Sequence, residues 1–113
     1  MNRNLSYLLD INEFIQDLLQ FVENIDESAF LTDKKTQNAV LYNITIIGEA
    51  VKKLTPDFRE QHPQIPWKQI AGMRDKLVHD YRQINLKQVW LVTQTDIPEL
   101  IKNLEPLLPK QED

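Results

Sequence analysis

The chain has 113 residues, a formal net charge of −4, two glycines and no cysteine. This length supports one domain with a hydrophobic core, and the lack of cysteine excludes disulfides, a thiolate nucleophile and thiolate metal ligands. The acidic balance argues against a general nucleic-acid binder, so we expect no DNA partner. No segment approaches about 18 uninterrupted apolar residues and the N-terminus does not resemble a signal peptide, so we expect a cytoplasmic protein without a membrane partner.

The charge is unevenly distributed along the chain. Residues 52–88 carry eight basic and four acidic side chains, a net charge of +4, whereas residues 1–51 and 89–113 have net charges of −5 and −3. A local positive field can hold an anionic substrate while the acidic remainder limits nonspecific binding. Chance segregation over a few dozen residues is the competing explanation.

Apolar side chains repeat with the helical period in the first half of the chain. The first stripe predicts a long helix that ends near Asp26, and Thr32 or Asp33 is placed to cap a second helix that ends before Pro56. The two stripes consist of Leu8, Ile11, Ile15, Leu18, Val22 and Ile25, and of Val40, Ile44, Ile47, Val51 and Leu54. We expect these two helices to pack antiparallel.

The second half of the chain predicts shorter helices and one long one. A short helix is expected over residues 56–61, and a third main helix should end around residues 81–84. Asn85 is a suitable cap for a last helix over residues 86–108. Pro98 lies inside that helix and should kink or split it, because proline lacks the N–H group and its ring displaces the carbonyl four residues back.

These elements define the expected fold class. No run of β-branched residues alternates with polar ones for long enough to predict a sheet. We therefore expect an all-α, antiparallel helical bundle of four to five helices with a kinked last helix. A single domain is expected over residues 1–108, followed by a polar C-terminal tail at residues 109–113.

The candidate catalytic side chains lie together in residues 74–81, with the sequence Arg-Asp-Lys-Leu-Val-His-Asp-Tyr. His79 suits proton transfer near neutral pH, and the planar fork of Arg74 suits a phosphate or a charged phosphorus centre. Asp75 is placed to hold one imidazole nitrogen of His79, and Tyr81 to bind substrate, donate a proton or be modified on its oxygen. The ordinary alternatives are a helix-end histidine, a surface arginine in an ion pair and a packed aromatic.

Helical geometry poses a problem for this motif. If the stretch is one helix, Arg74 and Tyr81 nearly eclipse, whereas Arg74 and His79 lie about 140° apart at ~100° per residue. One helix does not easily aim Arg74 and His79 at one atom. Either the helix ends near His79, or a second copy of the chain completes the site.

Other polar and aromatic residues give weaker signals. Glu49 lies off the apolar stripe, where it either meets the motif helix or a partner, or forms an ordinary ion pair with Lys53. Trp67 and Trp90 are expected to anchor the core or a subunit interface. With two histidines and no metal-type spacing among acidic residues, we expect no metal site and no cofactor.

The spacing Arg74-x4-His79-x-Tyr81 resembles the R-x4-H-x-Y signature of HepT-like proteins, a branch of the HEPN superfamily of small helical ribonucleases. Further stretches resemble the same family in the same order and extend the likeness over nearly the whole chain. They are Ile47-Gly48-Glu49-Ala50, Ile65-Pro66-Trp67, Gly72-Met73-Arg74-Asp75, His79-Asp80-Tyr81, Val89-Trp90 and Asp96-Ile97-Pro98-Glu99-Leu100.

The resemblance implies the toxin of a type VII-like toxin–antitoxin pair. Such a toxin is a metal-independent RNA endonuclease that acts as a homodimer, with Arg74 and His79 of both subunits lining one composite cleft. His79 would help to activate the ribose 2′-hydroxyl, and Arg74 would stabilise the charged phosphorus centre. The products would be a 2′,3′-cyclic phosphate and a 5′-hydroxyl, and Asp75 and Glu49 are candidate supporting residues.

The resemblance also implies a partner, an MntA-like nucleotidyltransferase antitoxin that transfers AMP units onto Tyr81. Family members often carry Asn after the motif arginine, so Asp75 either weakens phosphate attraction or orients His79. A function from another class stays open at this point: a non-catalytic helical binding partner or regulator of a nucleotidyltransferase. The acidic net charge favours that alternative modestly.

Overall fold

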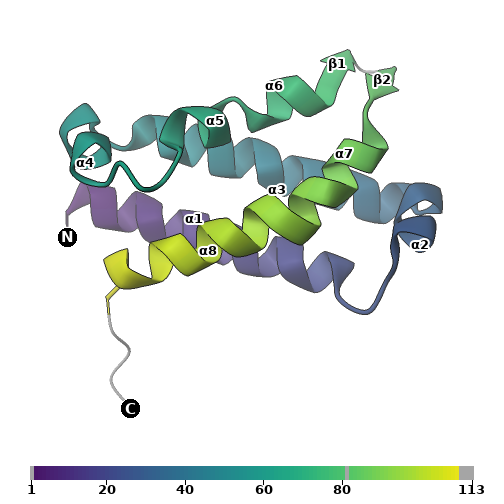
Figure 1. Cartoon of the computed structure of the whole chain (residues 1–113), viewed down its shortest axis with the longest axis horizontal. Helices are drawn as coiled ribbons and strands as arrows, with labels where there is room; N and C mark the ends of the chain where they lie inside the picture. Colours follow the sequence, from purple (N-terminus) through teal and green to yellow (C-terminus); the bar gives the residue numbers. More distant parts are fainter. Residues whose placement is uncertain (1, 81, 110–113) are drawn as a thin grey trace.

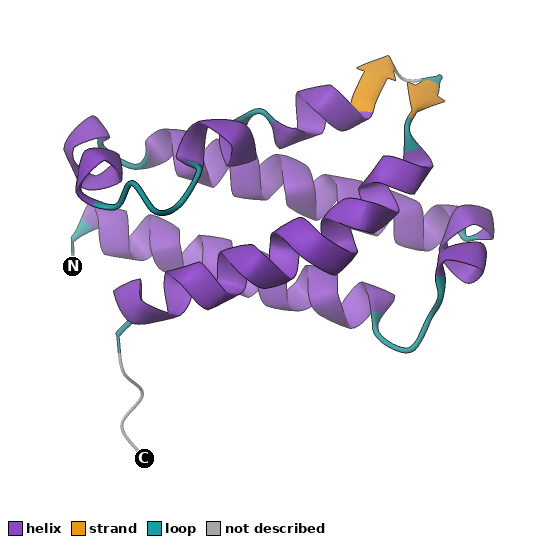
Figure 2. Ribbon diagram, viewed as in Figure 1, coloured by secondary structure: helices purple, strands orange, loops and turns teal. Residues whose placement is uncertain are grey.

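A computed structural model of the chain describes residues 2–80 and 82–109, and Met1, Tyr81 and residues 110–113 lie outside that description. The elements are α1 (Arg3–Val22), α2 (Glu27–Thr32), α3 (Lys34–Lys53), α4 (Pro56–Gln61), α5 (Trp67–Ala71), α6 (Met73–Leu77), β1 (Val78–Asp80), β2 (Gln83–Ile84), α7 (Leu86–Leu91), the π-helical turn η1 (Val92–Asp96), α8 (Ile97–Leu104) and the 3-10 turn η2 (Glu105–Leu107). Figure 2 shows a helical molecule with one small pair of strands, so the prediction of an all-α bundle is confirmed.

The two long helices α1 and α3 form one layer of the bundle. They lie side by side and antiparallel, and the α7–α8 run crosses in front of them (Figure 1). Both predicted stripes face the core: every member is buried except Ile25, which is half-buried. Full burial of one such aliphatic side chain contributes roughly 1.5–3 kcal/mol, so these two stripes supply much of the force that holds the helices together.

The first connection differs from the prediction. Helix α1 ends at Val22, four residues before the expected end, and Asn24 takes a left-handed backbone conformation with φ of 65°. Asp26 instead caps the unpredicted helix α2, where its Oδ1 accepts a hydrogen bond from the N–H of Ala29 at 2.8 Å. Asn tolerates the left-handed region better than most residues, which explains where the chain turns.

The last helix absorbs Pro98 through a change of hydrogen-bond register. The N–H of Ile97 donates to the carbonyl of Val92, five residues back, and this closes the π-helical turn η1 directly before the proline. The backbone stays helical through this region, so the run from Leu86 to Leu107 continues instead of breaking. A π-turn of this kind is a recognised way to accommodate a helix irregularity, and it often occurs at functional sites.

The two tryptophans lie in the core, which confirms the core interpretation. Trp67 is 6% exposed and Trp90 is 9% exposed. The indole N–H of Trp67 donates to the carbonyl of His62 at 3.0 Å, while Trp90 packs on Phe30 with ring centroids 5.4 Å apart. None of the helices in the described part of the chain is both long and apolar enough to cross a membrane.

Candidate functional site

The motif lies where helix α6 gives way to the strand β1. Arg74 and Asp75 belong to α6, whereas His79 and Asp80 belong to β1, and all four side chains are exposed. Tyr81 lies outside the described residues. The structure therefore places the predicted catalytic arginine and histidine on two consecutive elements at the surface of the molecule.

The expected third helix ends earlier than predicted, and it is also divided. Gly72 separates α5 from α6, and α6 ends at Leu77 instead of around residues 81–84. Val78 takes an extended conformation, and its backbone pairs with Ile84 in the small hairpin. The hairpin is closed at its base by a hydrogen bond from the N–H of Asn85 to the carbonyl of Leu77, at 2.9 Å.

This ending removes the angular mismatch. Because α6 stops before His79, the angle of about 140° that one continuous helix would impose does not apply. The alternative of a helix that ends near His79 is confirmed. Helical geometry by itself then no longer requires a second copy of the chain.

Asp80 has a positioning role that the sequence reasoning missed. Its Oδ1 accepts hydrogen bonds from the backbone N–H groups of Arg82 at 2.7 Å and Gln83 at 3.1 Å. Asp commonly closes a turn by bonding the backbone two or three residues ahead, so an Asp directly before a turn was the available signal. This contact holds the hairpin that carries His79.

Gly48 sets the position of the motif relative to α3. A Cβ atom at Gly48 would lie 3.1 Å from the carbonyl oxygen of Ala71 and 3.4 Å from that of Ile70. The glycine thus permits a close approach of α3 to the C-terminal end of α5, directly before α6. The position of the motif relative to α3 depends on this contact.

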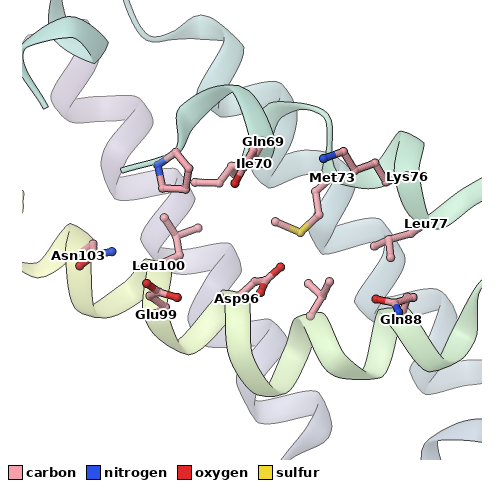
Figure 3. Close-up of a pocket in the computed structure, with 12 residues that line it drawn as sticks. Gln69, Ile70, Met73, Lys76, Leu77, Gln88, Asp96, Glu99, Leu100 and Asn103 are labelled. Atoms are coloured by element: carbon pink, nitrogen blue, oxygen red, sulfur yellow. The ribbon is translucent and has the colours of Figure 1, made fainter. Parts of the chain in front are cut away.

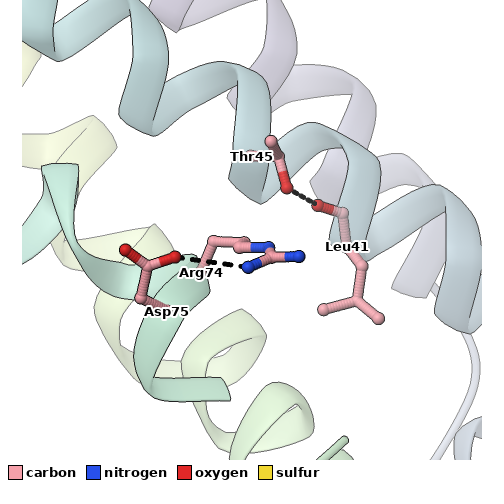
Figure 4. Close-up of polar contacts among 4 residues, drawn as sticks. All are labelled: Leu41, Thr45, Arg74 and Asp75. Atoms are coloured by element: carbon pink, nitrogen blue, oxygen red, sulfur yellow. Dashed lines mark hydrogen bonds and ion pairs between the residues drawn. The ribbon is translucent and has the colours of Figure 1, made fainter. Parts of the chain in front are cut away.

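Helix α6 presents different side chains on its two sides. Lys76 and Leu77 line a cavity of about 480 Å³ between α5–α6 and the α7–α8 run, and Arg74 and His79 do not (Figure 3). The guanidinium of Arg74 points instead toward α3 at Leu41 and Thr45 (Figure 4). Arg74 on one side, and Lys76 and Leu77 on the other, therefore face two separate surfaces (Figure 4).

Arg74 pairs with its own neighbour. Its Nη1 lies 3.3 Å from the Oδ1 of Asp75, with side-chain exposures of 49% and 74%, and this is the single ion pair among residues 2–80 and 82–109. In the same part of the chain, no hydrogen bond or ion pair joins His79 to Arg74 or Asp75. Of the two roles considered for Asp75, the structure shows a contact with Arg74 and none with His79.

The supporting candidate Glu49 follows Gly48 on α3 and is exposed. It makes no ion pair with Lys53 within the described residues, so the ordinary explanation for this carboxylate is not observed. By helical spacing Glu49 shares its face of α3 with Asn38, Tyr42 and Thr45, and Arg74 points toward Thr45 (Figure 4). Among the described residues, no group of three or more His, Asp or Glu side chains is arranged to hold a metal ion.

The fold and the site together define a class of protein: a small all-α bundle that presents an arginine and a histidine at a helix-to-hairpin junction. A family model described as "Ribonuclease HepT-like" matches residues 11–107. The chain therefore belongs to the HepT-like family of the HEPN superfamily.

Individual relatives agree with this assignment. "Probable ribonuclease HepT" of Thermococcus cleftensis is 45% identical over 101 residues, which cover 89% of this chain and 92% of the relative. Two proteins named "Putative RNase" show similar identity. The one from Methanocaldococcus jannaschii is 42% identical over 103 residues, covering 91% of this chain and 85% of the relative. The one from Caldanaerobacter subterraneus subsp. tengcongensis is 41% identical over 105 residues, covering 93% of this chain and 94% of the relative. No solved structure matched the chain.

Proposed function

We propose that this protein is an endoribonuclease of the HepT type and the toxin of a toxin–antitoxin pair. The observation that carries the proposal is the match of nearly the whole chain to a ribonuclease family, with Arg74 and His79 both exposed on adjacent elements. The basic segment supports it, because residues 52–88 have a net charge of +4. Five of its basic residues, Arg59, Lys68, Arg74, Lys76 and Arg82, belong to α4, α5, α6 and the hairpin, which run along one edge of the bundle in Figure 1. Such side chains can attract RNA phosphates.

The proposed reaction needs one general base and one positively charged side chain. The His79 imidazole accepts the proton of a ribose 2′-hydroxyl, whose oxygen attacks the adjacent phosphorus, and the bond to the 5′-oxygen breaks. Arg74 donates to the phosphoryl oxygens as negative charge develops there. The leaving 5′-oxygen takes up a proton from an imidazolium or from water, which yields a 2′,3′-cyclic phosphate and a 5′-hydroxyl without a metal ion.

A homodimer with a composite cleft is part of the proposal. It is supported by family membership and by an exposed face on α3, where Tyr42 is 62% exposed although its ring lies 6.4 Å from that of Phe14. Arg74 points toward this helix at Leu41 and Thr45 (Figure 4). A second copy seated on the face would cover the tyrosine and bring its own Arg74 and His79 close to the first pair.

The regulation that the resemblance implies is also a proposal. An MntA-like nucleotidyltransferase would transfer AMP units onto the hydroxyl of Tyr81, two residues after His79 in sequence. Each added phosphodiester carries negative charge, which would repel RNA from the site. Co-expression of the two proteins should add the mass of one or more AMP units to the wild type and none to Tyr81→Phe.

The test of the catalytic proposal is an RNA cleavage assay with purified protein in EDTA. His79→Ala and Arg74→Ala should each lose about 10²-fold or more of the rate, in line with the loss of general base or electrostatic catalysis. His62→Ala is the matched control, because the chain has two histidines and His62 packs on Phe58 with centroids 4.6 Å apart. Circular dichroism should show that all variants remain folded.

The outcomes separate the two candidate functions. Cleavage that persists undiminished in both His79→Ala and Arg74→Ala contradicts the assigned site. If the wild type cleaves no RNA under any condition and still binds a nucleotidyltransferase, the protein is a non-catalytic partner or regulator. Cleavage of an RNA that is lost when the target nucleotide is 2′-deoxy supports the proposed 2′-hydroxyl nucleophile.

A further inference from the structure

A long groove lies between two helical walls. One wall is α5 and α6, and the other is the run α7–η1–α8; together they enclose the cavity of about 480 Å³ (Figure 3). The second wall contributes residues from Gln88 to Asn103, about 22 Å of helix at 1.5 Å per residue. The volume lies within the roughly 300–1,000 Å³ of typical ligand sites.

Apolar side chains make up half of the lining of this groove, and the polar half includes one basic side chain, Lys76, on the α5–α6 wall. Ile70, Met73 and Leu77 come from the first wall, and Val92 and Leu100 come from the second. All five are at least 92% buried, so they form a fixed surface and not a set of mobile side chains. Such a lining favours apolar partner side chains because it removes further hydrocarbon from water.

Acidic side chains border one wall of the groove. Asp96, at the end of the π-helical turn η1, points into the groove, and Glu99 lies one turn further on (Figure 3). Asp96 accepts a hydrogen bond from the hydroxyl of Thr95 at 3.1 Å. Within residues 2–80 and 82–109, neither carboxylate is paired with a basic side chain.

We propose that this groove binds an amphipathic helix of a partner protein, with apolar side chains against the lining and lysine or arginine beside Asp96 and Glu99. Two helical walls with apolar side chains between polar ones match the helix-in-groove mode, in which anchors repeat at i, i+3 or i+4, and i+7. The two carboxylates complement a basic flank on that helix. The site is independent of RNA cleavage, because neither Arg74 nor His79 lines it.

Met73 provides a direct reporter of occupancy. The chain has two methionines, Met1 and Met73, and Met73 lines the groove. Protein labelled with ¹³C at the methionine methyls should give two NMR signals, and Met73→Leu assigns them by removing one. The probe is a synthetic 15-residue helical peptide with leucines at i, i+4 and i+7 and lysines flanking that stripe.

The lysine peptide should shift the Met73 methyl signal to saturation and leave the Met1 signal in place. The same peptide with glutamates in place of the lysines should bind several-fold more weakly. The double variant Asp96→Asn, Glu99→Gln should weaken binding of the lysine peptide about three- to tenfold, the range expected for two partly exposed ion pairs. Glu105→Gln is the matched control, because Glu105 is exposed on η2 and does not line the groove.

Several results would overturn the proposal. They are an unmoved Met73 signal at millimolar lysine peptide, equal affinity for the two peptides, undiminished binding by the double variant, and a Met73 shift caused by a small alkylammonium ion but not by the peptide. A change of sedimentation mass in the free double variant would show that a second copy occupies the groove, which also overturns it. RNA cleavage by the double variant should equal that of the wild type.

Discussion

At the scale of single residues, Asp75 offsets part of the positive charge that Arg74 would present to an RNA phosphate. The 3.3 Å contact places a carboxylate against the guanidinium, although both side chains are substantially exposed. Asp75→Asn should therefore raise RNA affinity by about 1.5- to 5-fold, the range for loss of one exposed competing pair. For single-stranded RNA, the plot of log K against log[salt] should become steeper by about 0.7. The reason is that Arg74 then neutralises one more phosphate, which releases a counterion from the RNA.

The measurement is a salt titration of RNA binding by the Asp75→Asn variant, made inactive by His79→Ala so that the RNA stays intact. Asp10→Asn on α1 is the matched control, because Asp10 is exposed and lies outside the motif. In the catalytically active background, a fall in kcat with unchanged RNA affinity would instead show that Asp75 acts through His79.

Residue types in the motif could be identified from the sequence, but their partners could not. Arg74 and His79 stand out because few side chains handle phosphate and protons, and their spacing matches a family signature. Spacing along an assumed helix placed Asp75 beside His79, but α6 ends at Leu77 and Asp75 contacts Arg74 instead. The turn made by Asp80 was not predicted, because it depends on the same helix end.

At the scale of elements, the close approach of α3 to α5 should be sensitive to any side chain at Gly48. Leucine there meets the carbonyl of Ala71, which belongs to a helix and cannot move aside like a flexible side chain. We expect Gly48→Leu to lower the free energy of unfolding by about 1–3 kcal/mol, as overpacking does. RNA cleavage should fall as well, since α6 follows α5 directly.

Gly72→Leu is the matched control for that substitution. The nearest atom to a Cβ at Gly72 is the carbonyl oxygen of Lys68 at 3.6 Å, which is ordinary contact, and the backbone φ of −98° suits any residue. Urea unfolding should show a larger loss for Gly48→Leu than for Gly72→Leu. Equal losses would mean that the α3–α5 approach is not tightly packed.

The N-cap of α3 should make stability depend on acid pH. The side-chain and backbone hydrogen bonds that Asp33 accepts from Thr36, at 2.6 Å and 3.1 Å, hold the pKa of Asp33 below its ordinary value of 3.8. A carboxylate with a lowered pKa in the folded state stabilises the fold above the unfolded pKa, and this stabilisation is lost as pH falls through the folded pKa.

Asp33→Asn isolates that contribution, because Asn keeps a capping oxygen and does not titrate in this range. We expect the difference in Tm between the wild type and Asp33→Asn to be constant at neutral pH and to shift against the wild type below about pH 3.8. Thermal unfolding followed by circular dichroism from pH 7 to pH 2 measures it. A difference that is independent of pH would contradict the role of the Asp33 charge.

The long helices were predictable because their apolar stripes extend over several turns and every repeat adds to the signal. Helix α2 has six residues, too few to show a period, and the β1–β2 hairpin is shorter still. The division at Gly72 and the end at Leu77 reflect packing on α3 and pairing between Val78 and Ile84. Such tertiary contacts join residues that local patterns treat separately.

At the scale of the whole molecule, the bundle separates three surfaces with different chemistry. Helices α4, α5 and α6 and the hairpin follow one edge of the bundle (Figure 1). The exposed face of α3 lies beside Arg74, and the groove bordered by Asp96 and Glu99 lies on the other side of the α5–α6 wall (Figure 3, Figure 4). Under the functions proposed above, RNA, a second copy of the chain and a partner helix each use a surface of their own.

The composite cleft makes a prediction that one subunit alone cannot satisfy. If Arg74 and His79 of both copies line one site, a heterodimer of an Arg74→Ala subunit and a His79→Ala subunit keeps one arginine and one histidine. Refolding the two inactive variants together should restore a cleavage rate at least about tenfold above either variant alone, because general base catalysis by itself is worth 10²–10⁴. Refolding Arg74→Ala with the Arg74→Ala, His79→Ala double variant should stay inactive, since no arginine remains. Heterodimers that form by native mass spectrometry but recover no activity would assign each site to a single subunit, where the end of α6 at Leu77 leaves His79 free of the helix that carries Arg74.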